Sequence, residues 1–183
     1  MKFLLIAAAT AGTLLAQAPA APLSYVNEIK QSYTGIKNTV LRSAEKMSEA
    51  DYGFKPSPDV RDFGGEVAHA ADIQIMLCSM ALNAPKQGTA ASLKTKADLI
   101  KALQDANALC DQAYNSLTDA NANQPRPFFG GSQRTLIGVL EFNISHHNET
   151  YGTMVPYMRM KGVVPPSSEP PPAQKGGGKG KGK

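Results

Sequence analysis

The side chains best suited to chemistry in this chain are its three histidines, His69, His146 and His147. Histidine is the commonest transition-metal ligand and the usual acid or base near neutral pH. His146 and His147 are adjacent on one predicted helix, and His69 lies on another. Metal sites in helical bundles take their ligands from facing helices. We therefore predict that any chemistry involves His69 and His146, the alternative being that each is a hydrogen-bonded histidine of the core.

Other polar side chains lie close to His146 on the same predicted helix. Thr150 is four residues further on and faces the same way, and Glu149 lies within reach of the same patch. His147 is rotated by about 100° and pairs with Tyr151 instead. We expect His147 either to support a ligand or to pack in the core, and Tyr151 either to orient a ligand or simply to pack.

The sequence lacks the other common signatures of chemistry or nucleic-acid binding. It contains no Ser/His/Asp arrangement, phosphate-binding glycine loop, Cys-x-x-Cys or paired-carboxylate motif. The net charge is +4, and the four lysines beyond residue 169 account for all of it, so residues 1–169 sum to zero. A basic face for nucleic acid is therefore not expected.

Four amphipathic segments must position these side chains. Their apolar residues recur every three or four positions, the period of a helix with one buried stripe. The segments cover residues 24–47, 63–83, 95–117 and, from 132 or 135, onward to 161. In the second, His69 shares a predicted inward stripe with Ile73, Met76 and Met80, and in the third Thr95 opens a capping box. With a turn-rich segment over 119–131 and no convincing strand pattern, we predict an all-α four-helix bundle.

The two ends of the chain differ from the domain between them. Lys2 followed by an apolar run and small residues predicts a signal peptide over 1–20, hence export to the periplasm or outside the cell. Residues 21–168 are predicted to form the bundle. The Pro-rich and then Gly/Lys-rich segment 169–183 is expected to be disordered. No later segment has the length and apolarity of a stable membrane span.

The two cysteines bear on topology. Cys78 and Cys110 each lie about 15 residues into a predicted helix, so they share a level only if the second and third helices run parallel. Export would allow a disulfide to persist. Two outcomes stay open, namely a disulfide between parallel helices or two separate buried thiols that behave as small apolar side chains.

The histidines and the C-terminal part of the bundle resemble the DinB family. The resemblance rests on His69, on His146 followed by Asn148-Glu149-x-Tyr151-Gly152, and on Tyr157-Met158-Arg159-Met160-Lys161-Gly162-x-x-Pro165-Pro166, with Asp51-Tyr52-x-Phe54-x-Pro56 upstream. It extends over about 24–168. It implies up-down-down-up connectivity with the second and third helices parallel, which agrees with the cysteine levels.

The resemblance also implies a metal site, and this sequence departs from it at one position. Family members commonly hold a divalent metal on three histidines, one in the second helix and two spaced by four in the fourth. His69 and His146 match the first two, but Thr150 stands at the third position. A hydroxyl is a weak ligand for zinc or nickel. Glu149 is the better substitute, because His147 would require the helix to rotate or unwind.

Two functions follow from this pattern. The first is an exported DinB-like domain with a degenerate divalent-metal site and no firm catalytic activity. The second, implied by thiol-dependent transferases and isomerases of the family, is a metal-dependent thiol transferase or hydrolase-like enzyme that uses His69 and His146. The partner that we predict is a small molecule or thiol; a homodimer is left open, and nucleic acid is not expected.

Overall fold

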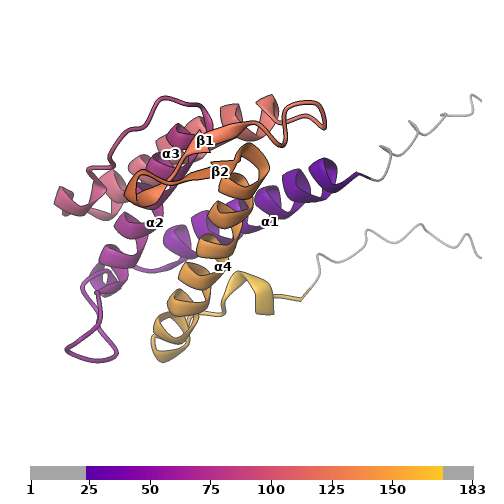
Figure 1. Cartoon of the computed structure of the whole chain (residues 1–183). Coiled ribbons are helices and arrows are strands. Elements are labelled where there is room, and N and C mark those ends of the chain that lie inside the picture. Colours follow the sequence, from indigo (N-terminus) through magenta and orange to yellow (C-terminus); the bar gives the residue numbers. More distant parts are fainter. Residues whose placement is uncertain (1–23, 171–183) are drawn as a thin grey trace, which may run out of the picture.

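The computed structural model describes residues 24–170, and the predicted signal peptide over 1–20 and tail residues 171–183 lie outside that part. Four long helices make up most of the fold (Figure 1). They are α1 (Tyr25–Lys46), α2 (Phe63–Ala81), α3 (Lys96–Ser116) and α4 (Leu136–Met160). The predicted all-α bundle is confirmed, with helix ends within a few residues of those expected.

Each long helix begins at a residue whose side-chain oxygen caps it. In all four, that oxygen accepts a hydrogen bond from the backbone amide three residues on. The capping residues are Ser24, Asp62, Thr95 and Thr135. Such a bond satisfies one of the unpaired amides of the first turn and stabilises a helix by about 1 kcal/mol. Thr95 is confirmed as the first residue that caps α3, since the amide of Asp98 donates to its hydroxyl, and this hydroxyl in turn donates to the Asp98 carboxylate at 2.6 Å.

Contacts at both ends show that α1 and α4 run parallel. At their beginnings, the Tyr25 hydroxyl donates to the Glu141 carboxylate at 2.8 Å. At their ends, the Lys46 ammonium donates to the backbone carbonyl of Val164, just beyond α4, at 2.8 Å. These two pairs fix the first and last helices in the same direction.

Helices α2 and α3 also run parallel to each other. Near their beginnings, a Cβ on Gly64 would lie 3.3 Å from a side-chain carbon of Leu99. Further along, Cys78 and Cys110 form a disulfide, with their Cα atoms 5.1 Å apart. Because equivalent levels of both helices meet, the predicted up-down-down-up topology is confirmed, and of the two outcomes left open for the cysteines the disulfide is the one observed.

The core is centred on a tyrosine of α3 that contacts two other helices. The Tyr114 ring stacks on the Tyr33 ring of α1, with centroids 3.7 Å apart. Its hydroxyl donates to the Leu140 carbonyl at 2.8 Å and accepts from the Asn143 amide at 3.0 Å, both on α4. Stacking and hydrogen bonding together hold α1, α3 and α4 at one level.

The inward face of α2 differs from the predicted stripe. His69, Ile73 and Met76 are only partly buried, whereas smaller side chains such as Ala70 and Ala71 are completely buried. The reason is that α2 contacts both α3 and α4, so most of its circumference is covered and small residues allow the close approach. Of the predicted stripe, Met80 is buried in the core, so a stripe assigned from the large apolar residues matched the buried face only at that position.

A small hairpin interrupts the segment predicted as turns. Strands β1 (Pro125–Pro127) and β2 (Gln133–Thr135) pair antiparallel, with Arg126 opposite Arg134. Arg126 also donates to the Ala81 carbonyl at the end of α2, at 2.7 Å. Three-residue strands are too short to show alternation, and prolines at both ends of β1 further obscure the pattern.

The C-terminal boundary lies slightly later than expected. Glu169, predicted to begin the disordered tail, contacts both Arg42 and Lys46 of α1 through its carboxylate. The preceding 3₁₀ turn, Pro166–Ser168, packs beside α4 (Figure 1). Among residues 24–170, none of the helices has the length and apolarity to cross a membrane.

The disulfide gives a prediction about stability. Replacing both cysteines, as Cys78→Ala with Cys110→Ala, should lower the free energy of unfolding by about 3 to 4 kcal/mol, because the unfolded chain loses a constraint on a loop of this length. Urea denaturation measures the change. Reductant should weaken the wild type similarly and leave the double variant unaffected; equal wild-type midpoints with and without reductant would contradict the prediction.

Candidate metal and ligand site

Two histidines from different helices meet between α2 and α4. The Nε2 atoms of His69 and His146 lie 3.2 Å apart, and the ring centroids are 4.9 Å apart. Both side chains are partly buried. The structure thus brings together the two residues that the sequence singled out, although they are 77 positions apart in the chain.

The surroundings of the pair favour neutral imidazoles. Burial is the largest cause that lowers the pKa of His69, and the nearby Arg61 cation and His146 lower it further. Burial also lowers the pKa of His146, where Glu149 acts in the opposite direction and Arg61 adds to the decrease. A neutral imidazole keeps a lone pair on one ring nitrogen, which is the form that binds metal.

The separation of the two nitrogens suits a shared ion as well as a hydrogen bond. Two nitrogen ligands at about 2.0 to 2.1 Å from a tetrahedral zinc ion lie roughly 3.3 Å from each other. The observed Nε2–Nε2 distance of 3.2 Å is close to that value. The separation of these two nitrogens is therefore compatible with two of the three expected ligands.

Thr150 stands at the position of the expected third ligand, and its hydroxyl contacts His146. Its hydroxyl donates to the His146 carbonyl at 2.9 Å and lies 3.4 Å from His146 Nδ1. With its proton on the carbonyl, the oxygen can accept the Nδ1 proton, which leaves the lone pair of His146 on Nε2, facing His69. Thr150 thus orients the imidazole, and its hydroxyl is used by these two contacts to His146.

Glu149, the expected substitute, is exposed on α4. Its negative charge acts to raise the pKa of both histidines, against the larger effect of burial. However, residues 24–170 contain no group of three His, Cys, Asp or Glu side chains arranged to hold a metal ion. The side chains present fit a two-histidine site better than a complete one.

His147 lies in the core. Its side chain is 1% exposed, and neither ring nitrogen has a hydrogen-bond partner in the described part of the chain. Burial lowers its pKa to about 3, and the neighbouring His146 and His69 add to the decrease. The Asn143 carbonyl acts in the opposite direction but does not form a hydrogen bond of good geometry. Of the two expected roles, packing in the core describes His147 better.

Tyr151 is hydrogen-bonded to the C-terminal 3₁₀ turn. Its hydroxyl donates to the Ser167 hydroxyl at 2.6 Å and accepts from the Ser167 amide at 3.0 Å. It therefore fixes the C-terminal 3₁₀ turn against α4. Of the roles expected for Tyr151, packing is the one observed.

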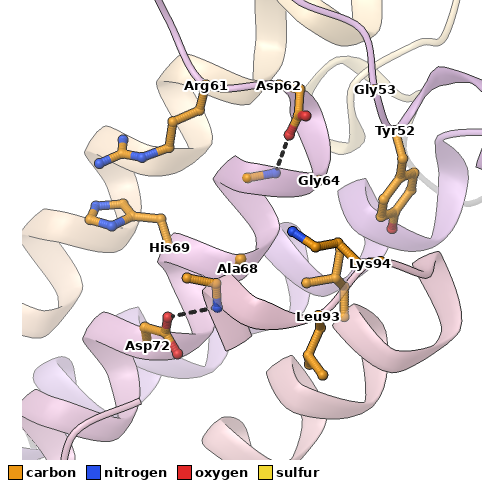
Figure 2. Close-up of a pocket in the computed structure, with 13 residues that line it drawn as sticks. Tyr52, Gly53, Arg61, Asp62, Gly64, Ala68, His69, Asp72, Leu93 and Lys94 are labelled. Atoms are coloured by element: carbon orange, nitrogen blue, oxygen red, sulfur yellow. Dashed lines mark hydrogen bonds between the residues drawn. The ribbon is translucent and has the colours of Figure 1, made fainter. Parts of the chain in front are cut away.

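A pocket of about 530 Å³ opens beside His69 and adds residues that the sequence analysis missed. Figure 2 shows the Arg61 guanidinium beside the His69 ring, and the Lys94 ammonium pointing toward α2. The Tyr157 hydroxyl donates to the Arg61 carbonyl at 2.8 Å and so positions its backbone. The only available signal was that Arg61 directly precedes the helix that carries His69.

The connectivity of the bundle, with two histidines meeting between its second and fourth helices, defines a DinB-like protein. The family model of the DinB superfamily matches residues 34–154. The chain belongs to the DinB superfamily. No curated protein matches it.

Solved structures of low sequence identity share the fold. A DinB-like protein from Bacillus cereus ATCC 10987 aligns with a TM-score of 0.67 at 17% identity, over 76% of this chain and 95% of that one. A DinB-like protein from Bacillus subtilis gives 0.61 at 20%, over 75% and 94%. The mycothiol-dependent maleylpyruvate isomerase gives 0.59 at 14%, over 71% of this chain and 59% of that one.

Burial of His147 predicts a loss of stability in acid. Its pKa is about 3 in the folded chain, against an ordinary value of 6.5, so the unfolded chain binds the proton more readily. Stability contributed by the neutral ring is complete above about pH 6.5 and declines as the pH falls toward 3. Between pH 7 and pH 5 we expect His147 to account for a loss of about 2 kcal/mol.

The variant His147→Leu tests this expectation, because leucine fills a similar volume and does not titrate. Urea denaturation of both proteins in chelator-treated buffer at pH 7 and pH 5 should show a smaller loss in the variant. Every other titrating group is common to the two proteins, so the difference between their losses isolates residue 147. Equal losses would contradict the assignment.

Proposed function

We propose that this protein is an exported DinB-like domain in which His69 and His146 form a degenerate divalent-metal site without catalytic activity of its own. The observation that carries the proposal is the 3.2 Å separation of the two Nε2 atoms, combined with a third position whose hydroxyl bonds to the His146 carbonyl. The pair keeps the ligand geometry, and the third ligand is missing.

The number of ligands supports weak binding over catalysis. Catalytic zinc sites in proteins use three protein ligands and leave a fourth position open for water or substrate. Here two neutral imidazoles supply two nitrogens, and zinc or nickel gains little from a threonine hydroxyl. A bound ion would supply Lewis-acid chemistry, while His69 and His146 hold it and Thr150 orients the His146 ring.

Export is part of the proposal and is supported by two observations. The N-terminal residues have the composition of a signal peptide. The disulfide between Cys78 and Cys110 is of the kind that persists in oxidising compartments and is rare in the cytosol.

The second candidate function is a metal-dependent enzyme that acts on a thiol or another small molecule. The pocket beside His69 favours it, since a reaction at the pair would need room for a substrate. The fold shared with the mycothiol-dependent isomerase is compatible with this reading but rests on 14% identity. Tight metal binding by the unmodified protein distinguishes this candidate from the first.

Restoring the third histidine should restore metal binding. We expect protein purified without a His tag to bind zinc or nickel weakly, and Thr150→His to bind at least about tenfold more tightly, which corresponds to 1.4 kcal/mol. Metal analysis after dialysis and titration calorimetry measure this. Thr34→His is the matched control, because Thr34 makes the same hydrogen bond to a preceding carbonyl, at 2.9 Å, but is exposed on α1.

Two results would contradict the degenerate-site proposal. One is near-stoichiometric, dialysis-resistant metal in the unmodified protein, which would favour the enzyme. The other is equal binding by the Thr150→His and Thr34→His variants, which would show that position 150 does not face the pair. Replacing both His69 and His146 by alanine should abolish any specific binding in all backgrounds.

A further inference from the structure

The pocket beside the histidine pair carries two cations that the metal proposal does not use. Arg61 comes from the segment before α2, and Lys94 comes from the segment before α3. Figure 2 shows both side chains at this pocket, with the Arg61 guanidinium next to His69. Because the two residues lie far apart in the chain, the parallel packing of α2 and α3 is what brings them to one pocket.

The carboxylates that line the same pocket are engaged by backbone amides. Asp62 accepts from the Gly65 amide at 2.6 Å. Asp72 accepts from the amides of Ala90 and Ala91 at 2.7 and 3.0 Å, one on each carboxylate oxygen. These bonds give both carboxylates a structural role, and their negative charges remain beside the pocket, where Arg61 and Lys94 supply the positive charges of the lining.

The two cations are weakly neutralised. Arg61 has one ion pair, to the buried Glu66 carboxylate, at a loose 3.5 Å, and its side chain is 54% exposed. Lys94 is exposed and makes no hydrogen bond or ion pair with any other residue in 24–170. A guanidinium has five donors in a planar fork that matches a carboxylate, so most of the binding capacity of Arg61 is unused.

We propose that this pocket binds a small molecule with two carboxylates. One carboxylate would bind Arg61 beside the histidine pair, and the other would form an ion pair with Lys94. The inference rests on the proposed function in that it names the ligand class of the same site. The volume of about 530 Å³ lies within the range of small-molecule pockets. The imidazoles next to Arg61 are neutral, so on that side of the pocket the guanidinium is the positive charge that a carboxylate of the ligand would meet.

Titration of the protein with succinate tests the proposal. Chelator-treated protein at low ionic strength is followed by NMR of the histidine rings, assigned with His→Gln variants. We expect saturable shifts centred on His69, weaker binding at high salt, and no comparable binding of the neutral analogue succinamide. Arg61→Gln and Lys94→Gln should each raise the Kd about tenfold or more, because each removes a charge-assisted contact.

The control variant is Arg134→Gln, since Arg134 lies at a different surface, over the rings of Phe128 and Phe142. It should leave the succinate Kd unchanged. The proposal is overturned if succinate gives no saturable shift, if succinamide binds equally well, or if Arg61→Gln and Lys94→Gln both bind like the wild type while remaining folded by circular dichroism. Because metal is removed, failure here is separate from failure of the metal-site proposal, which depends on Thr150→His.

Discussion

The parallel packing of α2 against α3 is the constraint on which the rest of the structure depends. It forces a long connection along the bundle between these helices, and that connection supplies Lys94 and the amides that engage Asp72. The disulfide between Cys78 and Cys110 holds the two helices at one level. With α3 in this position, α4 packs against the other side of α2, and His146 meets His69.

Small residues make this central position of α2 feasible. Ala68, Ala70 and Ala71 are buried, and Gly64 lies against Leu99 and Tyr52 with no room for a larger side chain without adjustment. Close packing on most of its surface leaves α2 few positions at which a polar side chain reaches solvent. His69 is at one of them, at the edge of the pocket. Its partial burial lowers its pKa and favours the neutral ring, and the pocket makes it accessible to a ligand.

The fold was predictable from local signals, and the site only in part. Helical periodicity and capping residues such as Thr95 are local, so they located the four helices; the levels of Cys78 and Cys110 added the relative direction of two of them. The meeting of His69 and His146 required the resemblance to the DinB family, because no local pattern specifies which helices face each other. Arg61 was missed because a charged residue before a helix has many ordinary explanations.

Thr150 shows how a site can lose a ligand and keep its geometry. The hydroxyl here donates its proton to the backbone carbonyl of His146, and its oxygen is left to accept the Nδ1 proton of the same residue. Metal-bound histidines depend on such a partner at the other ring nitrogen, which fixes the tautomer and the ring orientation. The residue in the third position thus acts on the neighbouring ligand, so that His146 still presents Nε2 toward His69. A pair held in this way, beside a pocket that carries Arg61 and Lys94, is suited to binding. Adding one nitrogen at residue 150 would supply the third ligand that chemistry requires.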